Sequence, residues 1–315
     1  MKTPAMGPLP AELPKNFWGK ILSATPVVMT VVATMLAGLA SSEMTRAQYD
    51  RSLAAQLQSK AGDQWSFFQA KKLRSAMQQS TLDGITATTD ARPVVALALM
   101  ERLAATPSSE VAKSDAGRAA LRVLEGAPLP EPPTAGPIDA HVRAALDGLE
   151  KSLPESEFNE LIKNVDDTVL ASTLRQARDR ARALDALTSP LSDAIGSFET
   201  ALLRARSSNI AGAAWNPRDF TVARLNYNAR RYDLEARHNQ SIAELYELQV
   251  RKNNLSAERH HRRSGQFFYG MLAAQMAVIM ASFAMAARKR SFLWSLAAAA
   301  GLAAIAFAIY VYVYV

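Results

Sequence analysis

Three long apolar segments constrain this chain more than any other feature of its sequence. They run from Ile21 to Ala40, from Phe267 to Ala287 and from Phe292 to Val315. A helix needs about 20 apolar residues to cross the hydrocarbon core of a bilayer, whereas an isolated strand there would leave its backbone polar groups unpaired. The sequence therefore predicts three transmembrane helices. The short basic link at 288–291 joins the last two as a tight hairpin.

The first apolar segment has a competing interpretation as a cleaved secretory signal peptide. Its end, from Ala37 to Ala40, has the small residues typical of a cleavage site. The apolar core of a signal peptide is only about 7–15 residues long, however, and this segment is longer. We expect an uncleaved anchor, with cleavage as the open alternative.

Polar side chains within the predicted spans are few. Gln275 is the strongly polar residue of the second span, and an amide in that position usually faces another helix and hydrogen-bonds there. A functional polar site at Gln275 is the alternative. Tyr310, Tyr312 and Tyr314 fall near the end of the third span, where aromatic side chains favour the membrane interface. Their alternation with valine resembles a strand, but helix is the expectation within lipid.

Basic residues predict the orientation. Lys2, Lys15 and Lys20 precede the first span, and Arg288 to Arg290 form the short link. Short basic segments stay on the cytoplasmic side, whereas long domains cross largely regardless of their charge. We therefore predict a multi-pass protein of the cell inner membrane, with link 288–291 cytoplasmic and the large domain periplasmic. The arginines at 259, 262 and 263 oppose this orientation, because they lie on the domain side.

The residues between the spans are rich in helix formers, so the predicted fold class is all-α, with an antiparallel coiled-coil-like stalk and a helical distal cap. Within the cap we expect one helix over 110–124 and one over 158–187, with Pro190 beginning another. The Pro-rich stretch is expected to be an extended surface spacer, or alternatively a ligand for a partner domain. The predicted parts are a basic tail 1–20, a span 21–41, a stalk helix 42–83, a cap 84–212 with a Pro-rich linker 127–137, a second stalk helix 217–265, and spans 266–287 and 292–315.

A heptad repeat organises the second stalk helix. Positions alternate in steps of four and three from Leu225 to Ala257, and Tyr232, Asn239 and Asn253 lie on this seam. That spacing is typical of a left-handed coiled coil. Buried asparagines would fix the register with a partner helix, and the alternative is that they face solvent.

The first stalk helix leaves the same face of the membrane, so the two should lie side by side and antiparallel. Equal distances from the membrane then place Trp65 near Ser241 and Phe68 near His238. In this register Trp65 and Phe68 are expected to cluster with Ile242 and Tyr246.

Catalytic and metal-binding signatures are missing from the sequence. The chain has no cysteine, which excludes disulfides and thiolate sites. His260 and His261 are adjacent, so on a helix they point about 100° apart and are poorly placed to bind one metal ion. We also find no phosphate-binding glycine loop, zinc-protease motif or nucleophile elbow. We therefore expect no enzyme activity, no cofactor and no metal, and identify no small-molecule substrate.

Three segments resemble one bacterial family, and they begin at Asp63, Ala243 and Arg263. They read Asp-Gln-Trp-Ser-Phe-Phe-Gln-Ala-Lys, Ala-Glu-Leu-Tyr-Glu-Leu-Gln-Val and Arg-Ser-Gly-Gln-Phe-Phe-Tyr-Gly-Met-Leu-Ala-Ala-Gln. They are similar to the domain of unknown function 4337 family, and the resemblance covers about 25–74 and 232–315. It implies helical inner-membrane proteins with no established activity, and it supplies no catalytic residues.

These features favour a membrane-anchored helical scaffold or interaction protein. Its expected partners are the lipid bilayer and either further copies of itself or another envelope protein. The net charge of +7 fits anionic lipid rather than nucleic acid, because no nucleic-acid-binding motif accompanies it. The alternative is a component of an oligomeric channel or transport complex, with Gln275 on its path.

Overall fold

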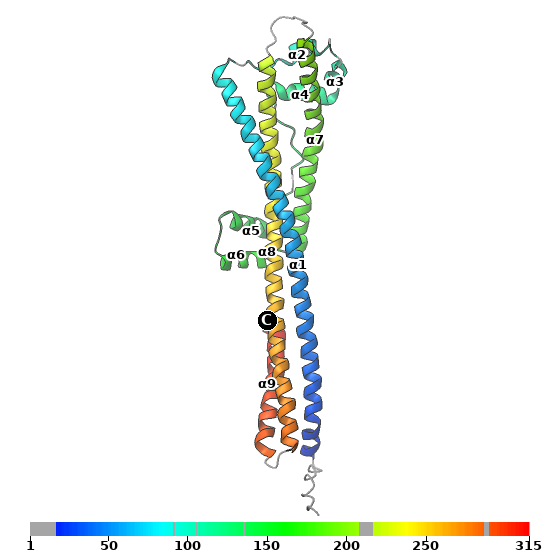
Figure 1. Ribbon diagram of the computed structural model, residues 1–315, viewed down its shortest axis with the longest axis vertical. Helices are drawn as coiled ribbons and strands as arrows, with labels where there is room; N and C mark the ends of the chain where they lie inside the picture. The colour runs from blue at the N-terminus through cyan, green and yellow to red at the C-terminus, as the bar shows by residue number, and fades with distance from the viewer. Residues whose placement is uncertain are drawn as a thin grey trace, which may run out of the picture. The chain divides into compact units, whose positions relative to one another are not determined.

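A computed structural model describes residues 17–90, 92–104, 106, 108–134, 136–207, 217–286 and 290–314. All regular secondary structure in these ranges is helical (Figure 1), which confirms the predicted fold class. The predicted basic tail up to residue 16, the residues 208–216 before the second stalk helix, and the link residues Arg288 and Lys289 lie outside them. The helices are α1 (Phe17–Thr88), α2 (Ala96–Ala104), α3 (Ser109–Lys113), α4 (Asp115–Leu124), α5 (Ala140–Glu150), α6 (Glu155–Lys163), α7 (Asp167–Ser207), α8 (Pro217–Ala286) and α9 (Arg290–Tyr314).

The two longest helices are each uninterrupted. α1 continues through Pro26 and past residue 83, the predicted end of the first stalk helix, and α8 continues from Pro217 into the second apolar segment. Anchor and stalk are therefore parts of the same helices, as the sequence predicts. The chain forms two compact units, one from residues 1–54 with 252–315 and one from residues 55–251.

The first unit contains the apolar parts of α1, α8 and α9, and its packing is the reverse of that of a water-soluble protein. The residues between its helices are mostly small, such as Ala33, Ala274 and Ala304, which form one buried cluster. Large apolar side chains point outward instead, with Met35 66% and Leu302 69% exposed. Helices associate in lipid through small residues and present large apolar side chains to the hydrocarbon. All three helices are long and apolar enough to cross a membrane.

The ends of this unit carry aromatic and polar side chains. Tyr310 is half exposed on α9, and Phe268 and Tyr269 are exposed on α8. Val311 packs with Phe267 in a buried cluster, so these aromatic residues occupy one level of the unit. That placement fits the predicted aromatic interface at Tyr310, while the side chains of Tyr312 and Tyr314 lie outside the described residues. α9 extends to Tyr314, which confirms helix rather than strand.

In the second unit, α8 lies between α1 and α7. The sequence did not indicate that α7 would pack beside the stalk helices. α7 and α1 are both antiparallel to α8 (Figure 1). Between 219 and 250, α8 has exposed side chains only at Asn226, Arg237 and Ser241. The heptad seam of α8 therefore accounts for only part of its buried surface.

A single apolar core joins α2, α3 and α4 to the C-terminal half of α7 and the start of α8. Leu99, Leu121, Phe198, Phe220 and Tyr227 are among its buried members. The α5–α6 hairpin is not part of this core and contacts a later portion of α8, where the guanidinium of Arg251 lies 4.9 Å from the ring centroid of Phe158. The predicted cap over 84–212 is therefore two helical clusters joined by the linker and by α7.

Three predicted helix boundaries within this region are wrong. The helix expected over 110–124 is broken at Ser114, whose hydroxyl accepts from the backbone N–H of Gly117 and caps α4. The helix expected over 158–187 is likewise broken before α7, where Asp166 accepts from the N–H groups of Thr168 and Val169. Local side-chain caps thus interrupt helices that the apolar periodicity alone would have continued.

The third wrong boundary is at Pro190, which lies inside α7 instead of beginning a new helix. A proline in a helix interior costs about 3 kcal/mol because it removes a hydrogen bond and crowds the preceding turn. Leu191, Ile195 and Phe198 follow it and are buried in the core. Tertiary packing therefore outweighs the local preference.

The described residues of the Pro-rich linker form no helix, as predicted, but the linker is not a free spacer. Leu129 is buried in the apolar core, and Pro132 is also buried. Arg230 of α8 donates a hydrogen bond to the carbonyl of Ala127 at 3.3 Å. The linker is therefore packed against the helices, because its apolar side chains at 129 and 132 fall on the side facing them.

Candidate functional site

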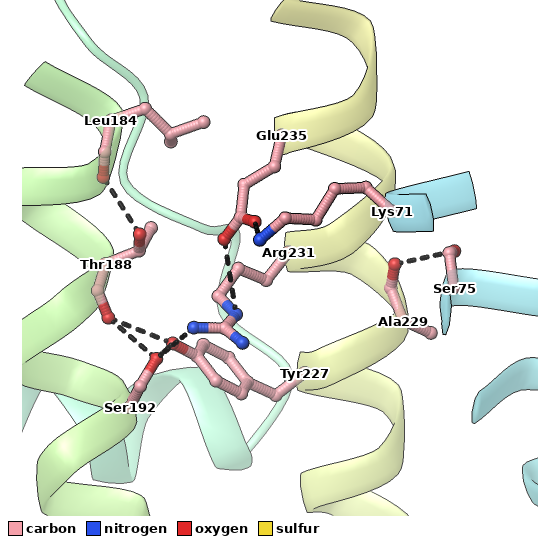
Figure 2. A network of polar contacts seen from close by, with 9 residues as sticks. All are labelled: Lys71, Ser75, Leu184, Thr188, Ser192, Tyr227, Ala229, Arg231 and Glu235. Atoms are coloured by element: carbon pink, nitrogen blue, oxygen red, sulfur yellow. Dashed lines mark hydrogen bonds and ion pairs between the residues drawn. The ribbon is translucent and has the colours of Figure 1, made fainter. Parts of the chain in front are cut away.

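A connected network of polar side chains joins α7, α8 and α1 (Figure 2). At its centre the Tyr227 hydroxyl is 2.7 Å from the Ser192 hydroxyl and donates to the carbonyl of Thr188 at 3.2 Å. Tyr227 and Thr188 are both fully buried. Burial raises the pKa of Tyr227 above its usual value of 10.0, although the hydrogen bond between Tyr227 and Ser192 opposes this shift. The tyrosine is therefore a neutral hydrogen-bonding group.

Arg231 and Glu235 extend this polar layer towards α1. Arg231 donates to the Ser192 hydroxyl at 2.7 Å, and its Nε lies 3.5 Å from the Glu235 carboxylate. The same carboxylate is paired with the ammonium group of Lys71 on α1. One continuous chain of contacts thus links all three helices (Figure 2).

Two further contacts fix α1 against α8. The Lys72 ammonium lies 2.5 Å from the Asp233 carboxylate, and the Ser75 hydroxyl donates to the backbone carbonyl of Ala229 at 2.8 Å. The hydrogen bond from Lys72 lowers the pKa of Asp233 below its usual 3.8. These contacts agree with the register predicted from the sequence, which places Phe68 near His238. Lys71 lies three residues after Phe68, and it pairs with Glu235, which lies three residues before His238.

The arrangement of these groups suits alignment of helices rather than chemistry. Each charged group described above is already paired with a protein group, and removing one partner of a buried pair is strongly destabilising. A single buried polar position is known to fix helix register at a cost in stability. The polar layer therefore specifies which residues of α1, α7 and α8 face each other.

Tyr232 was expected to pack in the stalk seam, and three cationic side chains lie near its ring. Arg231 lies 4.6 Å from its ring centroid, Lys71 5.3 Å and Arg74 5.9 Å. Cations over an aromatic face are attracted by the ring's quadrupole. Tyr232 thus supports the α1–α8 contact through its ring.

The four residues of the predicted aromatic cluster form two pairs, one on α1 and one on α8. Trp65 and Phe68 make an edge-to-face contact, with centroids 5.5 Å apart and planes at 82°. Ile242 and Tyr246 are both buried on α8. Asn239 and Asn253 on the seam are half-buried, so neither faces open solvent fully.

Gln275, the polar residue of the second span, is exposed on α8. Its neighbours on that face include Met276 and Ile279, which are also exposed. Within this chain the side chain therefore does not face α1 or α9. The predicted contact with another helix is therefore not made within the described part of this chain.

Two polar contacts join α1 and α8 in the first unit. Nδ1 of His260 lies 2.5 Å from a carboxylate oxygen of Glu43, and the buried Ser264 hydroxyl donates to the carbonyl of Ala40 at 2.7 Å. His261 is exposed. The adjacent histidines thus have different surroundings, as expected for neighbouring helical residues, and the described residues contain no cluster of metal-ligating side chains.

Sequence reasoning missed Tyr227, Arg231, Glu235 and the α7 residues that meet them. The available signal was a spacing of four, because positions 227, 231 and 235 share one face of α8, as Thr188 and Ser192 share one face of α7. That signal lay on a different face from the heptad seam. It became recognisable only once α7 was known to pack beside α8.

Comparison with known proteins gives one match. Residues 18–123 match a family described as a domain of unknown function, DUF4337. The match includes the segment beginning at Asp63 and extends through α4, beyond the predicted limit near Arg74, whereas the two C-terminal segments lie outside it. No curated protein and no solved structure matches the chain. The chain is therefore DUF4337-like over residues 18–123, a resemblance that carries no assigned activity.

Proposed function

We propose that this protein is a membrane-anchored helical scaffold. The observation that carries the proposal is the combination of an outward-facing apolar surface in the three-helix unit with a polar layer whose charged groups pair with one another. The first suits a lipid anchor, and the second suits a rigid support. We expect no catalytic activity, because the polar layer has no group left free to react with a substrate.

We further propose that the protein is a multi-pass protein of a bacterial inner membrane. Link 288–291 would be cytoplasmic and the large helical domain periplasmic, which follows from the basic residues of the short segments. The scaffold would bind a second copy or another envelope protein. Gln275 supports such a contact, since an amide exposed to hydrocarbon lacks the hydrogen bonds that a neighbouring helix can supply.

The same residue supports the second candidate function, a subunit of an oligomeric channel. In a ring of copies, Gln275 would line a common path. The helical spans otherwise expose apolar side chains, and transport paths usually carry ionisable groups. The scaffold is therefore the preferred proposal.

Ion flux through reconstituted vesicles tests the choice. The purified full-length chain is placed in sealed liposomes, and potassium release is compared with protein-free liposomes. A scaffold gives no additional release. Release that Gln275→Leu abolishes, while Ser282→Ala on the same helix leaves it unchanged, would establish the channel. The Ser282 hydroxyl is satisfied within its own helix by the carbonyl of Val278, which makes it a suitable control.

Self-association is tested separately with cysteine crosslinking. The chain has no native cysteine, so a single Gln275→Cys substitution reports only on that position. A scaffold that pairs through α8 gives a disulfide-linked dimer in membranes. Leu302→Cys on α9 is the matched control, because Leu302 is also exposed but lies on another helix. Equal crosslinking at both positions would indicate random collision.

A further inference from the structure

A cavity of about 460 Å³ lies in the second unit where α1, α5, α6 and α8 meet. Its volume is within the range of small-molecule sites, about 300–1,000 Å³. The residues that decide its chemistry are Trp65, Glu150, Phe158, Glu244, Glu247 and Arg251. None of them belongs to the polar layer around Tyr227.

The wall of this cavity is acidic. Glu150, Glu244 and Glu247 line it, and Arg251 is the one cation among the lining residues. Arg251 is bound to Glu247 at 3.3 Å. Two carboxylates therefore lack a cation among the residues of the wall.

Glu244 is a half-buried carboxylate of this wall. Its contact with the amide of Gln240 measures 2.8 Å. Burial raises its pKa above the usual 4.5, and the negative charges of Glu150 and Glu247 raise it further. A positive charge placed in the cavity would relieve this repulsion.

Two aromatic side chains, Trp65 and Phe158, also line the cavity, and one of them already holds a cation. The Arg251 guanidinium lies 4.9 Å from the Phe158 ring centroid. Trp65, the aromatic side chain that attracts cations most strongly, also lines the cavity. Aromatic surfaces combined with carboxylates are the chemistry that recognises organic ammonium ions.

A metal ion fits this cavity poorly. No group of three or more metal-ligating side chains lies close enough together, anywhere in the described chain, to coordinate an ion. A hard cation such as Mg²⁺ also demands closely placed oxygen ligands rather than aromatic surfaces. We propose that the cavity binds a small organic ammonium ion, with Glu244 supplying the counter-charge and Trp65 the apolar contact.

Titration calorimetry of the full-length protein in detergent tests this proposal, with choline as the probe. Its neutral carbon isostere, 3,3-dimethyl-1-butanol, has nearly the same shape without the charge. We expect choline to bind, and the isostere to bind at least about tenfold more weakly, a difference of about 1.4 kcal/mol. Glu244→Gln and Trp65→Leu should each weaken choline binding by about tenfold or more.

Glu160→Gln is the matched control, because it removes one exposed carboxylate of α6 that is paired with Lys163 outside the cavity. It should leave choline binding unchanged. Circular dichroism and the melting temperature of each variant establish that it remains folded. Absence of binding by the wild-type protein, equal affinity for the isostere, equal loss in Glu160→Gln, or Glu244-dependent binding of Mg²⁺ without binding of choline would each overturn the proposal. Liposome flux and cysteine crosslinking do not depend on this cavity, so the scaffold and the ammonium site can fail separately.

Discussion

The Tyr227 hydroxyl of α8 lies 2.7 Å from the Ser192 hydroxyl of α7, in a position where Tyr227 is fully buried. Tyr227→Phe removes this hydrogen bond and the one to the Thr188 carbonyl, but keeps the ring. The net contribution of one such hydrogen bond is about 0.5–1.5 kcal/mol, so for two we expect a loss of stability of about 1–3 kcal/mol by thermal or denaturant unfolding. Tyr49→Phe is the control, since Tyr49 is 68% exposed, and its stability should stay within about 0.5 kcal/mol of wild type. Equal effects of the two substitutions would contradict the role assigned to the polar layer.

The ion pair between Lys71 and Glu235 should be energetically coupled. Both side chains are less than a third exposed, so solvent screens the pair less than it screens a surface pair. A double-mutant cycle with alanine at both positions is expected to give a coupling energy of about 1 kcal/mol. The pair between Asp179 and Arg182 provides the comparison, because its side chains are 59% and 70% exposed. Its coupling should be below about 0.5 kcal/mol, and a similar value for Lys71 and Glu235 would mean that their contact does not fix register.

Gly117 permits a close contact between α3 and α4. A Cβ atom there would lie 1.9 Å from the carbonyl oxygen of Val111, so the backbone would have to move. Gly117→Ala is expected to lower stability by about 1–3 kcal/mol. Gly196→Ala, in the exposed interior of α7 with no atom near the added Cβ, should instead raise stability by about 0.5–1 kcal/mol. Stabilisation by both substitutions would show that the helix break at Ser114 is not required.

The lowered pKa of His238 predicts how the stability of the fold depends on pH. Burial lowers its pKa below the usual 6.5, and the positive charge of Arg180 lowers it further, against an opposing effect of Glu131. Because the folded protein disfavours the protonated form, the contribution of neutral His238 is complete above about pH 6.5 and declines as the pH falls below that value. We expect the melting temperature to decrease between about pH 7 and pH 5, and to decrease less in His238→Gln. His141→Gln, which changes an exposed histidine, should retain the wild-type decrease.

The long apolar helices and the antiparallel register were predictable because they depend on features that repeat along the sequence. The spacing from Leu225 to Ala257 and the continuity of α1 and α8 needed no knowledge of distant contacts. The position of α7 did not follow from the same patterns, since Ser192 and Arg231 are far apart in sequence and meet only through tertiary packing. Pro190 shows the same limit, because a residue that ordinarily ends a helix is held inside one by the apolar core around Phe198.

The acidic cavity was also beyond sequence reasoning. Trp65, Glu150 and Glu244 come from three different helices, and no short motif links them. Trp65 was singled out only as a packing residue of the stalk. Its place at the cavity follows from the α5–α6 hairpin contacting α8, which the expected single cap at 84–212 did not include.

Membrane topology provides the most direct test of the central claim, that three helices cross a bilayer and leave the helical domain on the side opposite link 288–291. Two single-cysteine variants, Ala70→Cys on an exposed position of α1 and Ser291→Cys at the end of the link, are labelled with a membrane-impermeant maleimide in sealed vesicles and again after permeabilisation. Three spans predict that one variant is labelled in sealed vesicles and that the other is labelled only after permeabilisation. Labelling of both variants from the same side would contradict the claim, as would release of the protein from membranes at alkaline pH.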